Sequence, residues 1–250
     1  MRPDSISTPY LSLVIPAYNE EERIVETLIS INAYLKTQPW SYEIIIVLNN
    51  CTDSTRTLVE SFINDDPAII VIDLGMLKGQ GNTKGIAVTK GMLAAKGDVR
   101  IFTDADLATP ITEIEKLINK SKDGYDVVIG SRQVTGSIVD KSQVWYRVFL
   151  GRAGNFLIQA LLLPGIKDTQ CGCKLFLADA AKEIFKYTSI SGWGFDIETL
   201  VIARSKGLNI IEIGIHWHDV DGSKVRAGAY FSTLKELLVL FWKYKVKKIA

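Results

Sequence analysis

The stretch IFTDADLATP, residues 101–110, runs from an apolar segment through two acidic residues to a proline. We expect residues 99–102 to form a strand. We expect Pro110 to open a helix, because proline fits the first helical turn, where its missing N–H costs no hydrogen bond. Asp104 and Asp106 then lie in the turn at the end of the strand. One short stretch thus contains a strand, a polar turn and the start of a helix.

The same order recurs through the first half of the chain. Short apolar runs end in polar or glycine-rich turns, and residues with helical spacing follow. We expect strands at residues 11–15, 43–47, 68–72, 99–102 and 127–129. Alternating strands and helices are typical of an α/β fold with a mostly parallel central sheet and helices on both faces. Ligands of such folds bind beyond the carboxyl ends of the strands, where the unusual polar residues of this chain fall.

The first of these units also predicts its own boundaries. Pro16 should end the first strand, because proline cannot donate a backbone hydrogen bond. Asn19 then has the position of an N-cap, ahead of Ile24, Leu28 and Ile31 at helical spacing. These three residues should be the buried face of the first helix.

After about residue 135 the pattern changes. We expect a long helix at residues 144–163, a β-rich run at 209–217 and a C-terminal helix at 233–247. The C-terminal helix is amphipathic, with lysines toward its end. Its expected apolar side contains Leu237, Leu238 and Phe241.

The composition excludes several classes of protein. Of 250 residues, 47% are apolar and 23% charged, which is typical of a globular chain, and a net charge of +1 gives no electrostatic sign of nucleic-acid binding. The three cysteines, Cys51, Cys171 and Cys173, indicate reduced thiols in a cytoplasmic protein, the last two as small buried residues near a turn rather than metal ligands. No apolar run reaches the roughly 20 residues of a membrane-spanning helix, and residues 11–17 do not resemble a secretory signal. We therefore expect any membrane contact to be peripheral, on the cytoplasmic face.

Asp104 and Asp106 have a chemical use at the end of a strand. Two ionised carboxylates this close repel each other, unless a divalent cation lies beside them. Mg²⁺ and Mn²⁺ prefer oxygen ligands, and Mg²⁺ commonly takes one or two carboxylates together with phosphates and water. The pair therefore predicts a metal–diphosphate site, with a solvated turn as the alternative.

Cationic residues at other strand ends support the metal–diphosphate interpretation. Arg132 follows the fifth strand and can hold a diphosphate with two donors. Lys84 lies in a glycine-rich loop, and Ser223-Lys224 follows a strand near the C-terminus, where it is another candidate for a phosphate contact. Each alone is more often a solvated surface charge, but together at strand ends they favour a functional site.

These residues stand in motifs that resemble a known family. The motifs are PAYNEE (16–21), KG (84–85), DAD (104–106), DTQCGCKLF (168–176), GWGFD (192–196) and DGSK (221–224). In these motifs the chain resembles inverting family-2 glycosyltransferases of the nucleotide-diphospho-sugar type, and within them the dolichyl-phosphate β-glucosyltransferases and other polyprenyl-phosphate glycosyltransferases. The resemblance covers residues from about 10 to about 245 and rests most on the later motifs.

The resemblance implies a GT-A fold in one domain, residues 1–250. Its first half, to about residue 135, would bind the nucleotide sugar, and its second half, with the C-terminal helix, the acceptor. The implied reaction is metal-dependent transfer of a hexose, with glucose favoured, from a UDP-sugar to a polyprenyl or dolichyl phosphate. The implied cofactor is Mg²⁺ or Mn²⁺, and the oligomeric state is left open.

The same resemblance implies roles for particular residues. Catalysis would involve Asp106, Asp196 and Arg132, and the metal would be held by Asp106 with support from Asp104. Donor-binding residues would be Pro16, Tyr18, Glu20, Asn49, Asn50, Lys84, Asp104, Ala105, Arg132 and Lys224. Arg147, Lys174 and Ser223 would face the acceptor phosphate.

A phosphate acceptor changes what the site must do. It is already anionic near neutral pH, so a general base is dispensable, and we expect Asp196 to orient the donor or a phosphate-binding cation. If the acceptor is instead a hydroxyl group of a polysaccharide or glycolipid, Asp196 must act as the base. A non-catalytic nucleotide-sugar-binding protein is a third hypothesis. Four intact residues argue against it: Asp104, Asp106, Arg132 and Asp196.

Several features depart from the family pattern. Asn49 and Asn50 replace a paired-aspartate segment, so the base preference stays open, although an amide can still accept from a base N–H. The residue at position 108 is alanine, which coordinates nothing, so we expect the metal to bind weakly until the nucleotide sugar arrives. His216 and His218 share one face of a strand, and we favour a partly exposed pair over metal ligands.

The two helices of the second half could also meet lipid. The lysine-tailed C-terminal helix and the helix at residues 144–163 could dock on an anionic membrane, or the latter could form a groove for the lipid acceptor. The alternative is that both bury their apolar faces in the core or in a subunit interface.

Overall fold

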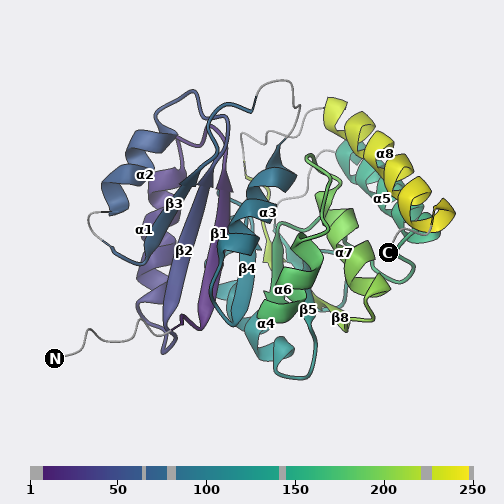
Figure 1. The fold of residues 1–250 in the computed structure, drawn as a ribbon. Coiled ribbons are helices and arrows are strands. Elements are labelled where there is room, and N and C mark those ends of the chain that lie inside the picture. Colours follow the sequence, from purple (N-terminus) through teal and green to yellow (C-terminus); the bar gives the residue numbers. More distant parts are fainter. Residues whose placement is uncertain (1–7, 64–65, 78–82, 141–144, 221–226, 248–250) are drawn as a thin grey trace.

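The computed structural model describes residues 8–63, 66–77, 83–140, 145–220 and 227–247 (Figure 1). The strands are β1 (Leu11–Ala17), β2 (Tyr42–Leu48), β3 (Ile69–Asp73), β4 (Val99–Thr103), β5 (Val127–Ser131), β6 (Ile138–Val139), β7 (Cys173–Leu177), β8 (Ile210–Gly214) and β9 (His216–Trp217). The helices are α1 (Ile24–Leu35), α2 (Thr55–Ile63), α3 (Lys84–Ala94), α4 (Ile114–Ser121), α5 (Trp145–Leu161), α6 (Ala178–Phe185), α7 (Phe195–Ser205) and α8 (Ala227–Phe241). A 3-10 turn at Ile111–Glu113 precedes α4, and a π-helical turn at Trp242–Val246 follows α8.

Within the described residues, a sheet with the strand order β3-β2-β1-β4-β7-β5-β8 forms the centre of the molecule. The β1–β2, β1–β4, β2–β3 and β5–β8 pairs are parallel, and β7 alone runs antiparallel to its neighbours. This arrangement confirms the predicted α/β fold with a mostly parallel sheet.

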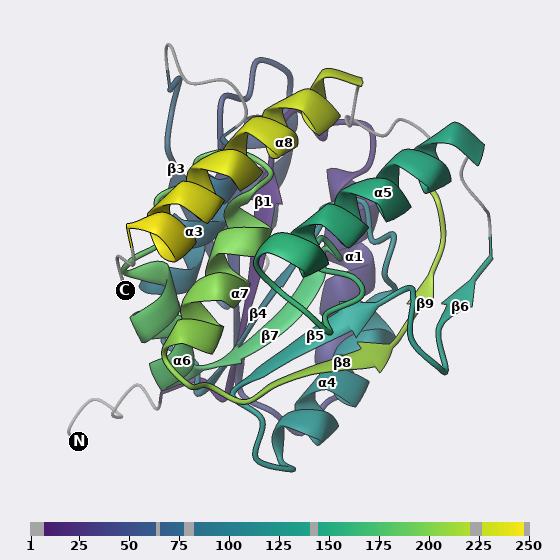
Figure 2. The ribbon, with the colours of Figure 1, turned by 90° about the vertical axis from the view of Figure 1, so that its right-hand side faces the viewer.

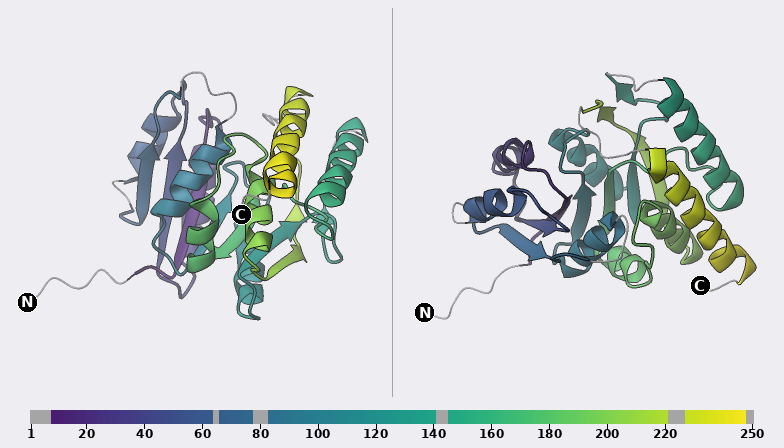
Figure 3. Two further views of the ribbon diagram at one scale, coloured as in Figure 1. Left: turned by 45° about the vertical axis from the view of Figure 1, so that its right-hand side comes forward. Right: turned by 90° about the horizontal axis from the view of Figure 1, so that it is seen from above.

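Helices cover both faces of the sheet (Figures 1 and 3). Side chains alternate between the faces along each strand, so Ile101 and Phe102 of β4 belong to two different core clusters. One cluster packs α1, α2 and α4 against the sheet, and the other packs α3, α6 and α7. Ile24, Leu28 and Ile31 lie in the first cluster, fully buried as predicted.

The start of the first unit differs from the prediction. β1 continues through Pro16 to Ala17, which is possible because its pairing with β4 ends at Val14 and Pro16 needs only the neighbour β2. Asn19 is not an N-cap: α1 begins at Ile24, and Asn19 has a positive φ of 53°. Its side-chain amide instead bonds the backbone N–H of Thr52 at 2.7 Å, tying together the turns after β1 and β2.

The antiparallel strand β7 was not predicted. A lysine at position 174 interrupts its apolar pattern. Because buried lysines are rare, a strand that contains one is missed when strands are inferred from apolar runs. β7 inserts between β4 and β5, which a purely parallel prediction would have placed side by side. Its entry brings residues of the second half of the chain into the centre of the sheet.

α5 and α8 lie side by side at the end of the molecule farthest from α1 and α2 (Figures 1 and 2). The predicted apolar side of the C-terminal helix was partly wrong. Leu237 is buried and Phe241 half-buried, but Leu238 is exposed on the outer side. In the described residues no helix is long and apolar enough to cross a membrane.

Candidate active site

The candidate site lies at the carboxyl edge of the parallel strands. Because β7 is antiparallel, its first residue, Cys173, pairs with the last residue of β4, Thr103. Residues 171–174 therefore lie beside Asp104, which follows β4 directly. The register of one strand pair thus brings two distant motifs together.

Asp106 lies in a tight turn after β4. Its Oδ1 accepts the backbone N–H of Ala108 at 3.0 Å, and Leu107 between them takes a positive φ of 49°. Burial and the nearby charge of Asp104 raise the pKa of Asp106 above its usual value. The two carboxylates therefore repel each other, as the sequence led us to expect.

Lys84 compensates part of this negative charge. Its Nζ lies 2.5 Å from Oδ1 of Asp104. Burial alone would lower the pKa of Lys84, but the carboxylates of Asp104, Asp196 and Asp106 outweigh burial and raise it. The ring of Trp193, from the loop before α7, lies 5.1 Å from the same ammonium group.

Gly172 explains the Cys-Gly-Cys sequence. A Cβ atom at this position would collide with the carboxylate of Asp104, with Cγ only 2.6 Å away. Glycine therefore lets the backbone of residues 171–173 approach the acid closely. Cys171 and Cys173 are buried on either side, and burial raises the pKa of Cys171 to about 11. The neutral, buried thiols agree with the expectation of small core residues near a turn.

A buried ion pair joins β7 to α7. The ammonium group of Lys174 contacts Oδ1 of Asp196 and donates to the carbonyl of Cys171 at 2.7 Å, and the lysine has no exposed surface. Burial raises the pKa of Asp196, and the cations Lys174 and Lys84 act against that shift. The ion pair holds the start of α7 against the centre of the sheet.

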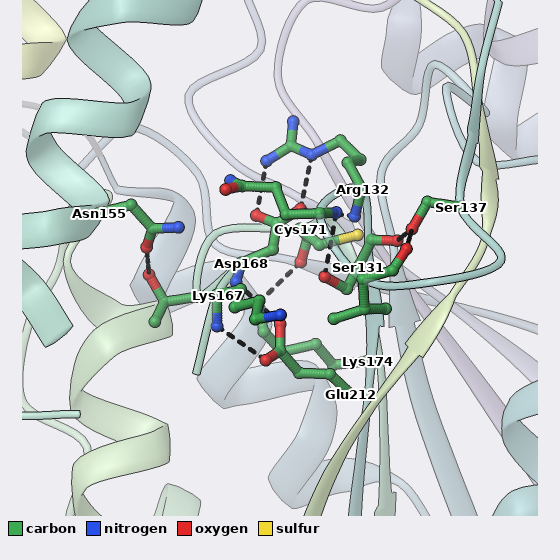
Figure 4. Close-up of polar contacts among 12 residues, drawn as sticks. Ser131, Arg132, Ser137, Asn155, Lys167, Asp168, Cys171, Lys174 and Glu212 are labelled. Carbon is green, nitrogen blue, oxygen red and sulfur yellow. Dashed lines mark hydrogen bonds and ion pairs between the residues drawn. The ribbon is translucent and has the colours of Figure 1, made fainter. Parts of the chain in front are cut away.

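Arg132 is held by a second ion pair, shown in Figure 4. Its Nε and NH2 donate to the two carboxylate oxygens of Asp168 at 2.7 and 2.8 Å, and its backbone N–H adds a third bond at 2.9 Å. Glu212 of β8 fixes the acid in turn, accepting the backbone N–H of Asp168 at 2.8 Å. Burial would lower the pKa of Arg132, but Asp168 outweighs it and raises the pKa. The guanidinium group is half-buried, with Trp217 5.3 Å away.

Asn49 and Asn50 form one network with Thr83, the residue before α3. The Thr83 hydroxyl donates to Oδ1 of Asn49 at 2.8 Å and accepts Nδ2 of Asn50 at 3.0 Å. Oδ1 of Asn50 also accepts the backbone N–H of Leu77 at 2.5 Å. The amides therefore join the turn after β2 to the segment that leads into Lys84.

The two carboxylates suit a metal ion that takes its remaining ligands from the substrate and from water. Among the described residues, no three His, Cys, Asp or Glu side chains gather closely enough to hold an ion by themselves. Asp104 and Asp106 are only half-buried and supply oxygen donors, which fit Mg²⁺ or Mn²⁺ with the remaining positions left to phosphates and water.

Comparison with known proteins identifies the family. Residues 12–185 match the family model described as glycosyl transferase family 2. The chain is a family 2 glycosyltransferase. It is 36% identical over 233 residues to "Dolichyl-phosphate beta-glucosyltransferase" of Dictyostelium discoideum, covering 88% of this chain and 70% of that protein. It is 31% identical to the Homo sapiens protein of the same name, covering 95% and 76%.

A solved structure confirms the GT-A fold predicted for this family 2 glycosyltransferase. Glucosyl-3-phosphoglycerate synthase from Mycobacterium tuberculosis, in complex with Mn²⁺, UDP and glucosyl-3-phosphoglycerate, superimposes with a TM-score of 0.69. The match covers 94% of this chain and 79% of that chain at 18% identity. At this identity the likeness supports the fold alone.

Four of the predicted donor-binding residues of the glycosyltransferase lie at or just after the ends of β1 and β4. Pro16 and Tyr18 are at the end of β1, with Tyr18 48% exposed. The backbone N–H of Glu20 bonds Thr55 at 2.7 Å, and the carboxylate of Glu20 pairs with Arg23 at 2.5 Å. Ala105 is buried, and its carbonyl accepts the hydroxyl of Thr27 at 2.7 Å. Their roles toward a nucleotide stay predictions.

Four charged residues of the site lie close enough together for their charges to interact: Lys84, Asp104, Asp106 and Asp196. Lys174 joins them through Asp196, but as a fully buried residue rather than one that faces an open surface. Ser223 and Lys224 lie outside the described residues, and so does the side chain of Arg147.

The histidine pair is partly exposed, as expected. The ring of His216 contacts the carboxylate of Asp140, and the two imidazole centroids are 6.5 Å apart. The backbone N–H of His218 bonds the carbonyl of Ala108 at 2.9 Å, so this segment borders the turn of Asp106.

Some residues of the site had no role assigned from the sequence. Asp168 and Trp193 were quoted within motifs only, and Gly172 was not singled out. A glycine between two buried cysteines is the available signal for a close backbone approach. Nothing in the sequence marks Asp168 as the partner of Arg132, because 36 positions separate them.

Proposed function

We propose that this glycosyltransferase moves glucose from UDP-glucose to dolichyl phosphate or another polyprenyl phosphate, with inversion at the anomeric carbon. The observation that carries the proposal is the similarity, along 88–95% of the chain, to proteins named dolichyl-phosphate beta-glucosyltransferase. The geometry of the site supports it independently through Asp196.

Asp196 is poorly arranged for a general base. It is buried, and its carboxylate already contacts the ammonium group of Lys174. A base must reach the proton that it removes, whereas an anionic phosphate acceptor has none to lose in the attack. The ion pair therefore favours a phosphate acceptor over a sugar hydroxyl.

The proposed step is a single displacement. An oxygen of the acceptor phosphate forms a bond to the anomeric carbon, and the bond from that carbon to the diphosphate oxygen breaks. The electron pair of the broken bond stays on UDP. The protein contributes by aligning the phosphate opposite the leaving group and by placing cations where negative charge develops.

The described residues divide this work between two groups. Asp104 and Asp106 would hold Mg²⁺ or Mn²⁺, which when bound neutralises charge on the departing diphosphate. Lys84 and Arg132, each held by a carboxylate, would add positive charge beside the phosphates. Pro16, Tyr18 and the Asn49–Asn50 pair would border the nucleotide at the ends of β1 and β2.

The acceptor is a lipid, and we propose that α5 and α8 contact the membrane that contains it. Phe231, Leu234 and Leu238 are exposed on the outer side of α8. Trp242, in the π-helical turn that follows, continues their spacing of three or four positions and is 57% exposed. Phe156 of the neighbouring α5 is 69% exposed. Exposed Lys235, Lys245 and Lys247 beside this stripe complement an anionic lipid surface.

The proposal is tested by incubating the protein with Mn²⁺, UDP-glucose and a short polyprenyl phosphate, and detecting a lipid-linked hexose by mass spectrometry. GDP-mannose and a polyprenyl alcohol are the matched donor and acceptor controls. Product from the alcohol, abolished in Asp196→Asn, would instead favour the hydroxyl-acceptor reaction. Tight UDP-glucose binding without any product would favour a binding protein.

A further inference from the structure

The loop between α6 and α7, residues 189–194, borders the candidate site. Its Trp193 lies against the ammonium group of Lys84, and Asp196 follows it in the first turn of α7. The loop is therefore linked directly to two site residues, to Lys84 through Trp193 and to Asp196 through the chain.

On its inner side the loop is attached to α3. The backbone N–H of Gly85 donates to the carbonyl of Ser191 at 2.8 Å. A Cβ atom at Gly85 would collide with the carbonyl of Ile190 and lie 2.8 Å from Cβ of Phe195. The loop thus packs directly on the residue next to Lys84.

On its outer side the loop is attached to α8 through Glu236. Oε2 of Glu236 accepts the backbone N–H of Gly194 at 2.7 Å. A Cβ atom at Gly192 would collide with the same carboxylate, and one at Gly194 would lie 2.9 Å from Cβ of Glu236. At both glycines of the Gly-Trp-Gly sequence, the side chain of Glu236 therefore leaves no room for a Cβ atom.

A second contact joins the end of α8 to the base of the loop. Glu198 of α7 is fully buried and accepts the backbone N–H groups of Ser189 and Ile190, both at 2.7 Å. Lys243, in the π-helical turn after α8, donates to Glu198 at 2.8 Å, and Tyr244 donates to it at 3.2 Å. The loop is thus held from α8 at two points.

The two sides of α8 have different surroundings. Its inner side contains Glu236 and the buried residues Leu237 and Leu240. Its outer side is the exposed apolar stripe Phe231, Leu234 and Leu238, which Trp242 continues into the π-helical turn. If a helix contacts lipid on one side and a loop of the site on the other, a change in its position on binding lipid can change the position of that loop.

We propose that Glu236 is a positioning residue that couples lipid contact by α8 to the 189–194 loop, so that seating α8 on a membrane orders the loop beside Lys84. The coupling rests on the proposed function only in that the membrane contains the acceptor. It acts by shifting the population of loop conformations, since binding at one site changes an equilibrium at another by a coupling free energy.

The experiment measures hydrogen exchange of the 189–194 segment in the full-length protein, with and without vesicles of phosphatidylcholine and phosphatidylserine that contain no acceptor. Vesicle binding is followed by co-sedimentation. We expect the vesicles to slow exchange of the loop amides by ~5-fold or more in the unmodified protein. Glu236→Ala should bind vesicles equally and lose that protection, whereas Glu236→Gln, whose amide oxygen can still accept from Gly194, should retain part of it.

Two further variants separate coupling from general damage. Glu60→Ala removes an exposed acid from α2 at the far end of the molecule and should leave the vesicle response unchanged. Lys243→Met breaks the second contact and should reduce the response even if Glu236→Ala fails to fold. In an assay with a water-soluble short-chain polyprenyl phosphate, Glu236→Ala and Lys243→Met should lose vesicle stimulation of kcat, whereas Glu60→Ala should keep it.

Each outcome bears on one proposal. Vesicle binding without added protection of the loop, or equal protection in Glu236→Ala, overturns the coupling. Absence of vesicle binding by the unmodified protein overturns it too. Failure to form any lipid-linked glucose contradicts the proposed function but leaves the exchange measurement interpretable, because that measurement uses neither donor nor acceptor.

Discussion

At the scale of single residues, three acids of the site each contact a cation. Asp104 contacts Lys84, Asp168 contacts Arg132 and Asp196 contacts Lys174. Asp106 differs: burial and the charge of Asp104 raise its pKa, and the charges of Lys84 and Arg23 offset only part of that rise. It is therefore the acid with the most to gain from a divalent ion.

We predict that Asp106→Ala lowers kcat for glucose transfer by about 10²-fold or more, the loss typical of one electrostatic group at a reacting centre. Asp123→Ala, which removes an exposed acid after α4, is the matched control and should keep normal kcat. Near-normal turnover of Asp106→Ala, with metal still required, would contradict the role given to Asp106.

The affinity of the protein for the metal should depend on whether the nucleotide is bound. With two carboxylates and an alanine at position 108, the free protein should bind Mn²⁺ weakly, because phosphates and water supply the other ligands. Calorimetry with Mn²⁺ should show clear tightening when UDP is present. Tight Mn²⁺ binding without UDP would show that further protein ligands exist.

The Arg132–Asp168 pair should contribute to stability in a pH-dependent way. Burial would raise the pKa of Asp168, but Arg132 outweighs burial and lowers it below its unfolded value. The contribution is therefore present above about pH 4, the unfolded pKa of aspartate, and is lost as pH falls through the folded pKa. Asp168→Asn should cost about 3 kcal/mol at pH 7.

Urea unfolding of the unmodified protein and Asp168→Asn at several pH values would measure this difference. The gap in unfolding free energy should shrink steadily below about pH 4. A gap that is equal at pH 7 and at pH 3 would mean that the charge of Asp168 is not the cause.

Gly172 offers a test of the site's geometry. Gly172→Ala should weaken binding of UDP and metal, because its Cβ would displace the Asp104 carboxylate. Gly151→Ala in α5 meets no neighbouring atom and should add about 0.5–1 kcal/mol of stability by favouring the helix. Normal UDP affinity in Gly172→Ala, measured by titration, would show that the carboxylate can move without consequence.

At the scale of elements, the hydrophobic pattern predicted the strands and helices whose apolar residues recur with a regular period. The strands β1 to β5 and the helices between them follow from apolar runs and turn residues. β7 did not, because Lys174 lies within it, and the acid that contacts this lysine, Asp196, is 22 positions away. The outward side of α8 was also missed, because Leu238 and Leu237 are neighbours in sequence but face opposite surroundings.

The outer stripe of α8 makes a prediction at this scale. Replacing Leu238 with glutamate should lower partitioning to anionic vesicles by ~10-fold or more, since burial of one leucine is worth about 2 kcal/mol. Ile29→Glu makes the same change at an exposed position of α1, at the opposite end of the molecule, and should have no effect. Equal vesicle binding of the two variants would place the membrane contact elsewhere.

At the scale of the whole molecule, the site lies where the strand order changes direction. The chain adds β2 and β3 on one side of β1 and β4 on the other, and the crevice at such a point is where α/β folds bind nucleotides. The sequence alone therefore predicted the edge and the acids that stand on it. The pairings Arg132–Asp168 and Lys174–Asp196 could not be predicted, because they depend on β7 entering the sheet in reverse.

The central claim is transfer of glucose to a lipid phosphate, and the most direct test is a product assay. The purified protein is given Mn²⁺, UDP-glucose and a short polyprenyl phosphate, and the lipid fraction is analysed by mass spectrometry and by the anomeric configuration of the sugar. The account predicts a β-linked glucosyl phosphate lipid, formed with UDP-glucose and with no comparable product from GDP-mannose or a polyprenyl alcohol. Glucosylation of the alcohol but not of the phosphate would contradict it.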